Sequence, residues 1–392
     1  MSGTSRRTGR VGVGFIGAGM ISEQYLTHLT RFPDVEVVRL SDIDTDRAAA
    51  QAAKHGVPRS GTVAELLADD DVEIVLNLTL PATHVEVSTA ALRAGKHVWT
   101  EKPVGLTRES AQGLVDLARE SGLLLGVAPD TVLGTGWQVA KRAIEAGVIG
   151  TPLTATTTMQ YQGPDVFHPN ASFLFADGAG PLFDMGPYYF TALVHLLGPV
   201  AQVAAMGTRS QETRRLLVGP NAGQEFPVAV PTHLSVLASF EQGGQAQSLL
   251  SFDTPLLRQG AFEVNGTEGT MVLPDPNTFG GGHAVRVVRP FAPTDFADGQ
   301  PVEQVWETVH EAEPEAGRGL GVLTMARAIR DGGVHVATGE VGLHVLDVML
   351  ASLDSAQSGR FVEVASSVDA VPSLPDDFDP FAATIGSSAL SA

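Results

Sequence analysis

Residues 11–22 read VGVGFIGAGMIS, and this stretch decides the fold. Its apolar beginning is typical of a buried strand, and the glycines after it are typical of a turn into a helix. The literal pattern G-x-G-x-x-G starts at Gly12, inside the apolar run, where it cannot form such a turn. The register that fits starts at Gly17, continues with Gly19 and has Ser22 in third place. It predicts a dinucleotide-binding turn, although a plain strand-to-helix turn has the same local pattern.

The chain beyond this turn alternates short apolar runs with helical patterns as far as residue 127. Runs of this length with helices between them predict a parallel sheet that carries helices on both faces. The apolar runs are 11–16, 35–40, 74–78, 98–99 and 123–127, and the helical patterns are 21–31, 45–55, 63–68, 84–94 and 108–121. We expect an α/β Rossmann domain over residues 11–130, preceded by a flexible arm over residues 1–10.

The pattern changes beyond residue 130, where strand-like runs follow one another without long helices between them. Such an order predicts an α+β domain with a large, mainly antiparallel open sheet. The strand-like runs are 153–160, 200–207, 232–240, 245–253, 261–265, 269–273 and 284–289, and helical patterns cover 138–146, 183–197, 319–331 and 339–358. We expect a substrate-binding and oligomerisation domain over residues 131–365, followed by an extended tail over residues 366–392.

The composition excludes several classes of function. A formal net charge of −19 disfavours nucleic acid and anionic membrane surfaces as partners. The absence of cysteine rules out disulfides, thiolate metal sites and cysteine nucleophiles. Eleven histidines are scattered without metal-ligand spacing, so no catalytic metal is expected. No apolar stretch approaches the roughly 20 residues that span a bilayer, and we expect a cytoplasmic enzyme.

Two further features favour NAD at the glycine turn. The helix that begins near Met20 and Ile21 presents free backbone N–H groups and its positive dipole end to phosphates. Asp42 follows the second apolar run, where an acid binds the adenosine ribose 2′-hydroxyl and repels a 2′-phosphate. NAD is therefore favoured over NADP, although Arg39 and Arg47 lie close in sequence and weaken the preference. A turn residue or a helix cap is the alternative role for Asp42.

The segment 95–103 reads GKHVWTEKP and is the most specific feature of the chain. Its last three residues, Glu101, Lys102 and Pro103, fall at the carboxyl end of a strand, where ligands bind in doubly wound sheets. Together with TLPATH at residues 79–84 and the glycine turn, this segment resembles the Gfo/Idh/MocA family of oxidoreductases. The resemblance covers most of the chain and continues through residues 143–150, 180–188 and 344–360.

The resemblance implies a set of cofactor residues and a catalytic lysine. Lys102 is expected beside the nicotinamide and the reacting hydroxyl, where partial desolvation next to a cation lowers a lysine pKa and suits proton transfer. The cofactor set consists of Gly17, Gly19, Met20, Ile21, Asp42, Thr79, Pro81, His84, Glu101 and Lys102. The resemblance also implies a homodimer or homotetramer held by the open sheet.

The segment 178–188 reads GAGPLFDMGPY and carries the second part of the expected catalytic site. Asp184 and Tyr188 are four residues apart, which places them on one face of a helix. Many family members have a histidine as acid/base where this chain has Tyr188, and a branch of the family carries tyrosine there. A tyrosine alone is a poor base, but a neighbouring Lys102 cation lowers its pKa, which predicts a proton relay. Asp184 would orient a substrate hydroxyl. Packing in a core is the alternative for Tyr188 and the preferred role for His195.

Two segments depart from the family and concern the substrate. Many members have Asn-x-Arg after the last Rossmann strand, whereas residues 128–137 read APDTVLGTGW, without arginine. Asp130 in this loop is a substrate candidate. The insert YQGPDVFHPN at residues 161–170 supplies His168 as a hydrogen-bonding candidate and Phe167 as a stacking candidate. A surface loop without function is the alternative for this insert.

Three functions are compatible with these residues. The first is an NAD-dependent enzyme that interconverts a secondary alcohol and a ketone on a sugar, glycoside or cyclitol, with Lys102 and Tyr188 moving the hydroxyl proton. The second is a lyase or hydrolase that oxidises C3 of a glycoside transiently and then eliminates the leaving group. The third is a non-catalytic NAD-binding sensor, which the retention of Lys102, Asp184 and Tyr188 disfavours.

Overall fold

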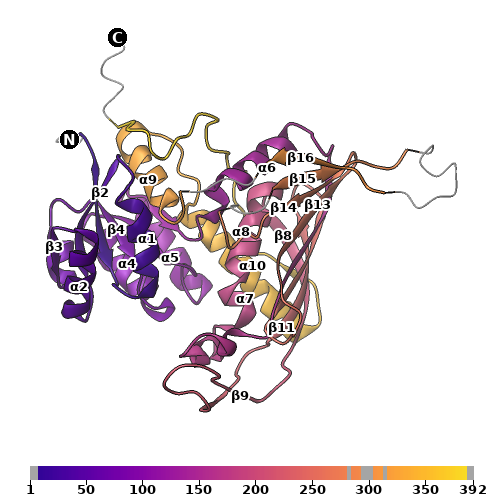
Figure 1. Ribbon diagram of the computed structural model, residues 1–392, viewed down its shortest axis with the longest axis horizontal. Coiled ribbons are helices and arrows are strands. Elements are labelled where there is room, and N and C mark those ends of the chain that lie inside the picture. The colour runs from indigo at the N-terminus through magenta and orange to yellow at the C-terminus, as the bar shows by residue number, and fades with distance from the viewer. Residues whose placement is uncertain (1–7, 280–283, 293–302, 312–315, 386–392) are drawn as a thin grey trace, which may run out of the picture. The chain divides into compact units, whose positions relative to one another are not determined.

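A computed structural model describes residues 8–279, 284–292, 303–311 and 316–385 of the chain (Figure 1). Contacts divide the chain into two compact units. The first comprises Met1–Leu133, Ala316–Leu346 and Pro372–Ala392, and the second comprises Gly134–Glu315 and Asp347–Val371. Most of the expected arm, residues 1–7, and the end of the expected tail, residues 386–392, lie outside the described residues.

The first unit holds a six-stranded sheet in the order β3-β2-β1-β4-β5-β6. The strands are β1 (Val11–Ile16), β2 (Val35–Ser41), β3 (Arg59–Gly61), β4 (Ile74–Asn77), β5 (His97–Thr100) and β6 (Leu125–Val127). Every pairing is parallel, which confirms the predicted Rossmann sheet. The sequence pattern does not predict β3, because Arg-Ser-Gly has no apolar residue to mark a strand. The strand order reverses between β1 and β4, and nucleotides bind at such a switch point.

Helices alternate with these strands because their apolar residues recur at helical spacing. In α5 (Arg108–Glu120), the residues Ala111, Leu114, Val115 and Ala118 are buried, and they lie three or four positions apart. The other helices of this part are α1 (Met20–Leu29), α2 (Thr45–His55), α3 (Val63–Leu67) and α4 (His84–Arg93). The bounds of α2 agree with the sequence pattern, because Asp44 caps its first turn and Gly56 ends it in a left-handed conformation.

Residues from the end of the chain complete the first unit. The backbone N–H of Val127 in β6 donates to the Ala337 carbonyl at 3.0 Å, and Gly126 forms a bridge with Thr338. Helix α9 (Leu320–Asp331) precedes this contact. Residues 316–346 therefore belong to the Rossmann unit, whereas the sequence pattern assigns them to the second domain. The physical reason is that β6 is an edge strand, and its open hydrogen-bonding groups are paired by this distant segment.

The tail is tied to the same unit by Asp34. This buried carboxylate accepts hydrogen bonds from the backbone N–H of Thr384 at 3.0 Å and from the Nε of Arg327 at 2.8 Å. Arg327 also donates to the Asp379 carbonyl at 3.0 Å. Because Thr384 and Asp379 of the tail each take part in one of these hydrogen bonds, the tail is held in place without regular secondary structure.

The second unit holds a nine-stranded sheet in the order β16-β15-β14-β13-β7-β12-β11-β8-β17. Its strands are β7 (Pro152–Gln160), β8 (Val200–Thr208), β11 (His233–Phe240), β12 (Gln245–Ser251), β13 (Arg258–Gly266), β14 (Thr270–Leu273), β15 (Val285–Val288), β16 (Trp306–His310) and β17 (Val362–Glu363). The pairings are antiparallel except that of β7 with β12, so the predicted mainly antiparallel sheet is confirmed. A short pair, β9 (Thr213–Arg215) and β10 (Glu225–Pro227), forms a sheet of its own.

Burial alternates along these strands. In β11, Leu234 and Val236 are buried, whereas Leu237 between Val236 and Ala238 is 53% exposed. One face of the sheet therefore belongs to the core and the other carries exposed side chains. The unit also contains α6 (Thr135–Glu145), and α10 (Gly339–Ser358) begins in the first unit and ends in the second.

The helix expected over residues 183–197 is two helices. They are α7 (Gly180–Asp184) and α8 (Gly186–Leu197), with Met185 between them. Pro187 has no N–H to donate to the carbonyl four residues earlier, so it cannot continue α7 and instead lies in the first turn of α8. Asp184 and Tyr188 therefore lie on different helices, and the prediction that they share one helix face is wrong.

Three histidines whose pKa is lowered in the native protein predict that acid destabilises the fold. Burial, helped by the nearby Lys141 charge, lowers the pKa of His195 to about 3, and burial lowers the pKa of His97 and of His335 to about 4. The unfolded chain takes up these protons near pH 6.5, and the native protein does not. Stability should therefore fall as the pH drops below 6.5, by up to about 1.4 kcal/mol per pH unit for each histidine. Urea unfolding at pH 7.5, 6.5 and 5.5 measures this, and an unchanged midpoint would contradict it.

Candidate active site

The glycine turn joins β1 to α1 at the carboxyl edge of the Rossmann sheet. Gly17 has φ +108°, and its N–H donates to the Ser41 carbonyl at 2.8 Å. A Cβ at Gly17 would lie 2.7 Å from the Leu78 carbonyl oxygen, so only glycine fits. Gly19 precedes α1, where no side chain caps the first turn. The turn therefore leaves backbone N–H groups of α1 available to a diphosphate.

Asp42 holds this turn from the end of β2. Its buried carboxylate accepts the Ala18 N–H at 2.7 Å, and Arg47 donates to it at 2.5 and 3.2 Å. Burial by itself raises the pKa of Asp42, but the hydrogen bonds from Arg47, Ala18 and Asp44 outweigh it and lower the pKa. Asp42 is thus ionised and fixes the glycine turn. That Asp42 accepts a hydrogen bond from a ribose hydroxyl stays a prediction.

Exposed apolar side chains surround the glycine turn. Met20 is 79% exposed, Ile43 97% and Leu80 71%, and they follow the neighbouring strands β1, β2 and β4. Large apolar groups in solvent at adjacent strand ends fit the flat faces of an adenine ring. Ile43 and Leu80 were not among the expected site residues. The signal for both was a large apolar residue within three positions of a strand end.

His84 links the loop after β4 to the turn after β5. Its ring is buried at the start of α4, with Nδ1 2.8 Å from the Pro103 carbonyl and Nε2 3.0 Å from the Thr79 carbonyl. Thr79 donates its hydroxyl to Asn77 Oδ1 at 2.7 Å. Because a carbonyl only accepts, a neutral imidazole satisfies one of these contacts at a time. His84 and Thr79 therefore shape the two loops, and Pro81 begins a short 3-10 turn (Pro81–Thr83) between them.

Glu101 and Lys102 follow β5 on the same sheet edge. The buried Glu101 carboxylate accepts the Tyr25 hydroxyl at 2.9 Å and the backbone N–H of Lys102 at 3.1 Å. Trp99 Nε1 donates to the Tyr25 oxygen at 3.2 Å. Lys102 is half-buried, whereas Glu101 is 8% exposed. The structure thus brings the expected residues of the first unit to the ends of β1, β2, β4 and β5.

Asp130, expected as a substrate residue, is fully enclosed. Its Oδ2 accepts the backbone N–H groups of Gly319 at 2.8 Å and Gly321 at 3.1 Å, at the start of α9. Burial raises the pKa of Asp130 in spite of the Arg318 charge and these hydrogen bonds. The contacts are those of a helix cap, and they account for a buried acid at this position.

The second unit carries the other expected residues. Tyr188 is 6% exposed in α8, and Asp184 is half-buried at the end of α7. Burial, followed by the charge of Asp184, raises the pKa of Tyr161, so Asp184 lies within electrostatic reach of Tyr161. The ring of Phe167, which is 61% exposed, stacks on Tyr161 with centroids 6.1 Å apart. These residues place an aromatic surface in the same unit as Asp184.

The segment 161–170 is anchored by a buried arginine that sequence reasoning missed. Arg214 pairs with Asp165 at 2.7 Å and Asp253 at 2.8 Å, and it donates to the Phe252 carbonyl at 2.7 Å. Within the segment, His168 Nδ1 accepts the Asn170 N–H at 3.1 Å, which in the neutral ring leaves the proton on Nε2. The segment is therefore ordered by specific contacts.

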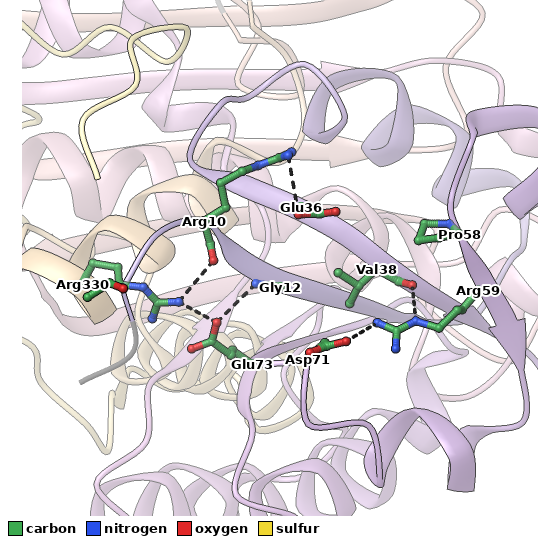
Figure 2. A pocket seen from close by; sticks show the side chains of 10 residues that line it. Arg10, Gly12, Glu36, Val38, Pro58, Arg59, Asp71, Glu73 and Arg330 are labelled. Carbon is green, nitrogen blue, oxygen red and sulfur yellow. Dashed lines mark hydrogen bonds and ion pairs between the residues drawn. The ribbon is translucent and has the colours of Figure 1, made fainter. Parts of the chain in front are cut away.

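A separate pocket of about 660 Å³ lies beside the residues that open β1, β3 and β4 (Figure 2). Its charged side chains are paired within it: Arg10 with Glu36 at 3.5 Å, Arg59 with Asp71 at 2.9 Å and Arg330 with Glu73 at 2.6 Å. Ligands of doubly wound sheets bind at the opposite, carboxyl ends of the strands. The candidate site is therefore the edge that carries the glycine turn and Lys102.

Two family descriptions match the two parts of the chain. Residues 11–128 match "Oxidoreductase family, NAD-binding Rossmann fold", and residues 137–272 match "GFO/IDH/MocA C-terminal domain". The chain belongs to the Gfo/Idh/MocA oxidoreductase family. Its first unit is an NAD-binding Rossmann domain, which the glycine turn and the strand order support.

This oxidoreductase is similar to enzymes with named activities. It is 28% identical to a 1,5-anhydro-D-fructose reductase of Ensifer adhaerens, over 91% of this chain and 99% of that one. It is 37% identical to inositol 2-dehydrogenase 3 of Saccharopolyspora erythraea, over 37% of this chain and 44% of that one. The structure of a levoglucosan dehydrogenase with NADH superposes with a TM-score of 0.77 at 22% identity, over 91% of this chain and all of that one. The last likeness concerns the fold.

Two features are absent from the part of the oxidoreductase that the structure describes. Within those residues, no group of three histidine, aspartate or glutamate side chains gathers as metal ligands would. Among the same residues, no helix combines the length with the hydrophobicity that crossing a membrane requires.

Proposed function

We propose that this oxidoreductase interconverts a secondary alcohol and a ketone on a sugar, glycoside or cyclitol. The observation that carries the proposal is Lys102, half-buried at the end of β5, one strand beyond the switch point of an NAD-binding sheet. The two relatives named above act on an anhydro sugar and on a cyclitol, which supports the substrate class.

The first unit would bind and orient the cofactor. The start of α1 would hold the diphosphate, and Asp42 would accept a hydrogen bond from the adenosine ribose. Ile43 and Leu80 offer apolar surface to the adenine. The negative charge of Asp42 favours NAD over NADP, and the ion pair with Arg47 moderates that preference. When bound, the nicotinamide supplies the hydride acceptor or donor.

The chain's own residues would handle the hydroxyl proton. In this proposal Tyr188 and Lys102 form a relay that moves the hydroxyl proton, in which each group passes on one proton before it accepts the next. Asp184 would accept a hydrogen bond from a second substrate hydroxyl. The burial of Tyr188 and the half-burial of Asp184 support these roles, because both groups would act partly out of water.

The segment 161–170 would form one wall for the substrate. Phe167 offers an exposed ring for the C–H face of a sugar, and Tyr161 supports it from behind by stacking. His168 would donate from Nε2 to a sugar oxygen. This role explains why a surface aromatic is held by the buried Arg214 anchor.

Turnover with a substrate panel tests the proposal. Purified protein with NAD should form NADH, measured at 340 nm, with at least one secondary alcohol among sugars, glycosides and cyclitols. Cleavage of a glycoside without net NADH would favour the transient-oxidation alternative. Cofactor binding without any turnover would favour a non-catalytic sensor.

We also propose that the protein forms dimers or tetramers through the open sheet. On the solvent side of β8 and β11, Met206 is 77% exposed and Leu237 is 53% exposed, which favours burial against a second copy. A sedimentation mass of one chain would contradict this.

A further inference from the structure

A buried chain of hydrogen bonds ends at the backbone of Lys102. Trp99 Nε1 lies 3.2 Å from the Tyr25 oxygen, Tyr25 lies 2.9 Å from Glu101 Oε1, and Glu101 Oε2 lies 3.1 Å from the Lys102 nitrogen. An indole N–H only donates and a carboxylate only accepts, so the direction is fixed. Tyr25 must accept from Trp99 and donate its own proton to Glu101.

The surroundings of Tyr25 keep its hydroxyl as the hydrogen-bond donor to Glu101. Tyr25 and Trp99 are 0% exposed. Burial, with the charges of Glu101 and Asp130, raises the pKa of Tyr25 well above its ordinary value, so the phenol stays protonated and remains a donor. Arg318 supplies the opposing positive charge from the segment before α9. Glu101 therefore has one oxygen held by Tyr25 and the other by the lysine backbone.

We propose that Tyr25 is a positioning residue for Lys102 and acts through the Glu101 carboxylate. The inference rests on the catalytic role proposed for Lys102. Tyr25 lies in α1, whose first turn is the phosphate-binding end, and Glu101 follows β5. One helix thus places both the cofactor phosphates and the turn that carries the lysine. A sequence motif, which spans only a short stretch, cannot assign this role, because Tyr25 and Glu101 are 76 residues apart.

Tyr25→Phe removes the hydroxyl and leaves the ring. It should lower kcat by about 10- to 100-fold, because small displacements of a reacting group are costly, and leave the KM values for NAD and substrate within about twofold. Tyr189→Phe is the matched control. Tyr189 is equally buried, and its oxygen accepts the Gly260 N–H at 3.0 Å in the second unit. Tyr189→Phe should leave kcat unchanged when its stability equals that of Tyr25→Phe.

Nuclear magnetic resonance supplies a readout that does not depend on turnover. The chain has four lysines, Lys54, Lys96, Lys102 and Lys141. Reductive ¹³C-methylation labels each, and loss of one signal in Lys102→Arg assigns Lys102. In the NAD-bound protein, Tyr25→Phe should move the Lys102 signal and leave the other three in place. Glu101→Gln, which removes the charge of the acceptor, should move the same signal and serves if Tyr25→Phe folds poorly.

The outcomes separate the two proposals. If Lys102→Met keeps its turnover, the catalytic role is wrong, while a moved Lys102 signal in Tyr25→Phe still supports the hydrogen-bonded link. If Lys102→Met is inactive and folded Tyr25→Phe and Glu101→Gln change neither kcat nor the Lys102 signal, the positioning role is overturned. A uniform shift of all four signals, with a raised KM, would also overturn it, since that indicates a general loss of structure.

Discussion

Lys102→Met should lower kcat by about 10²- to 10⁴-fold, the range that general acid–base groups contribute. Methionine keeps the length and apolar stem of the side chain and removes the ammonium, so proton transfer is lost while the turn after β5 keeps its hydrogen bonds. The dissociation constant for NAD, measured by fluorescence titration, should change by less than about fivefold, because the proposed phosphate and ribose contacts follow other strands.

Lys96→Met is the matched control for this prediction. Lys96 is also a lysine of the first unit, 8% exposed, and its Nζ donates to the Asp69 carbonyl at 2.8 Å. Its loss should lower stability and leave kcat unchanged. Tyr188→Phe should reproduce the Lys102→Met defect, and the double variant should be no worse than either, because members of one relay are not additive. Additive losses would argue against a relay.

Arg214→Met should destabilise the protein by about 3–5 kcal/mol, the usual cost of removing one partner from a buried ion pair. Asp165 and Asp253 would lose the cation that pairs with both of them, and the Phe252 carbonyl would lose its donor. Urea unfolding measures the effect. The KM for the substrate should rise with it, because Arg214 anchors the segment that carries Phe167 and His168.

Arg215→Met, one residue further on, is the control. Arg215 pairs with Glu225 at 2.7 Å, but both side chains are more than half exposed. Such a pair contributes less than about 1 kcal/mol, so the unfolding midpoint should move little. Equal losses of stability in Arg214→Met and Arg215→Met would contradict the prediction that the buried ion pairs of Arg214 stabilise the protein more than the exposed pair of Arg215.

The sequence predicts those parts of the molecule whose signals are local. The strand Val11–Ile16 and the helix Thr45–His55 were predicted to the residue, because an apolar run and a capped helix each mark their own ends. The turn at Gly17 also has a local signal, since a glycine between a strand and a helix indicates a tight turn. The break at Met185 was missed because Pro187 stops one helix and starts another without changing the apolar pattern.

The missed parts of the site depend on distant contacts. Tyr25 meets Glu101 across 76 residues, and Arg214 meets Asp253 across 39. Neither Tyr25 nor Arg214 has a neighbour in the sequence that indicates its distant contact. The grouping of Lys102 with Tyr188 remains a prediction, because it unites residues of different units.

The division of the chain has a consequence for its synthesis. The carboxylate of Asp130 accepts hydrogen bonds from N–H groups that lie 189 and 191 residues later in the chain. Strand β6 likewise pairs with residues near 338. A nascent chain released as far as residue 133 has every strand of the Rossmann sheet but lacks the residues that pair with the outer edge of its last one. The nucleotide-binding half therefore finishes folding only after nearly all of the other half has left the ribosome, and a fragment cut at residue 133 is an incomplete domain.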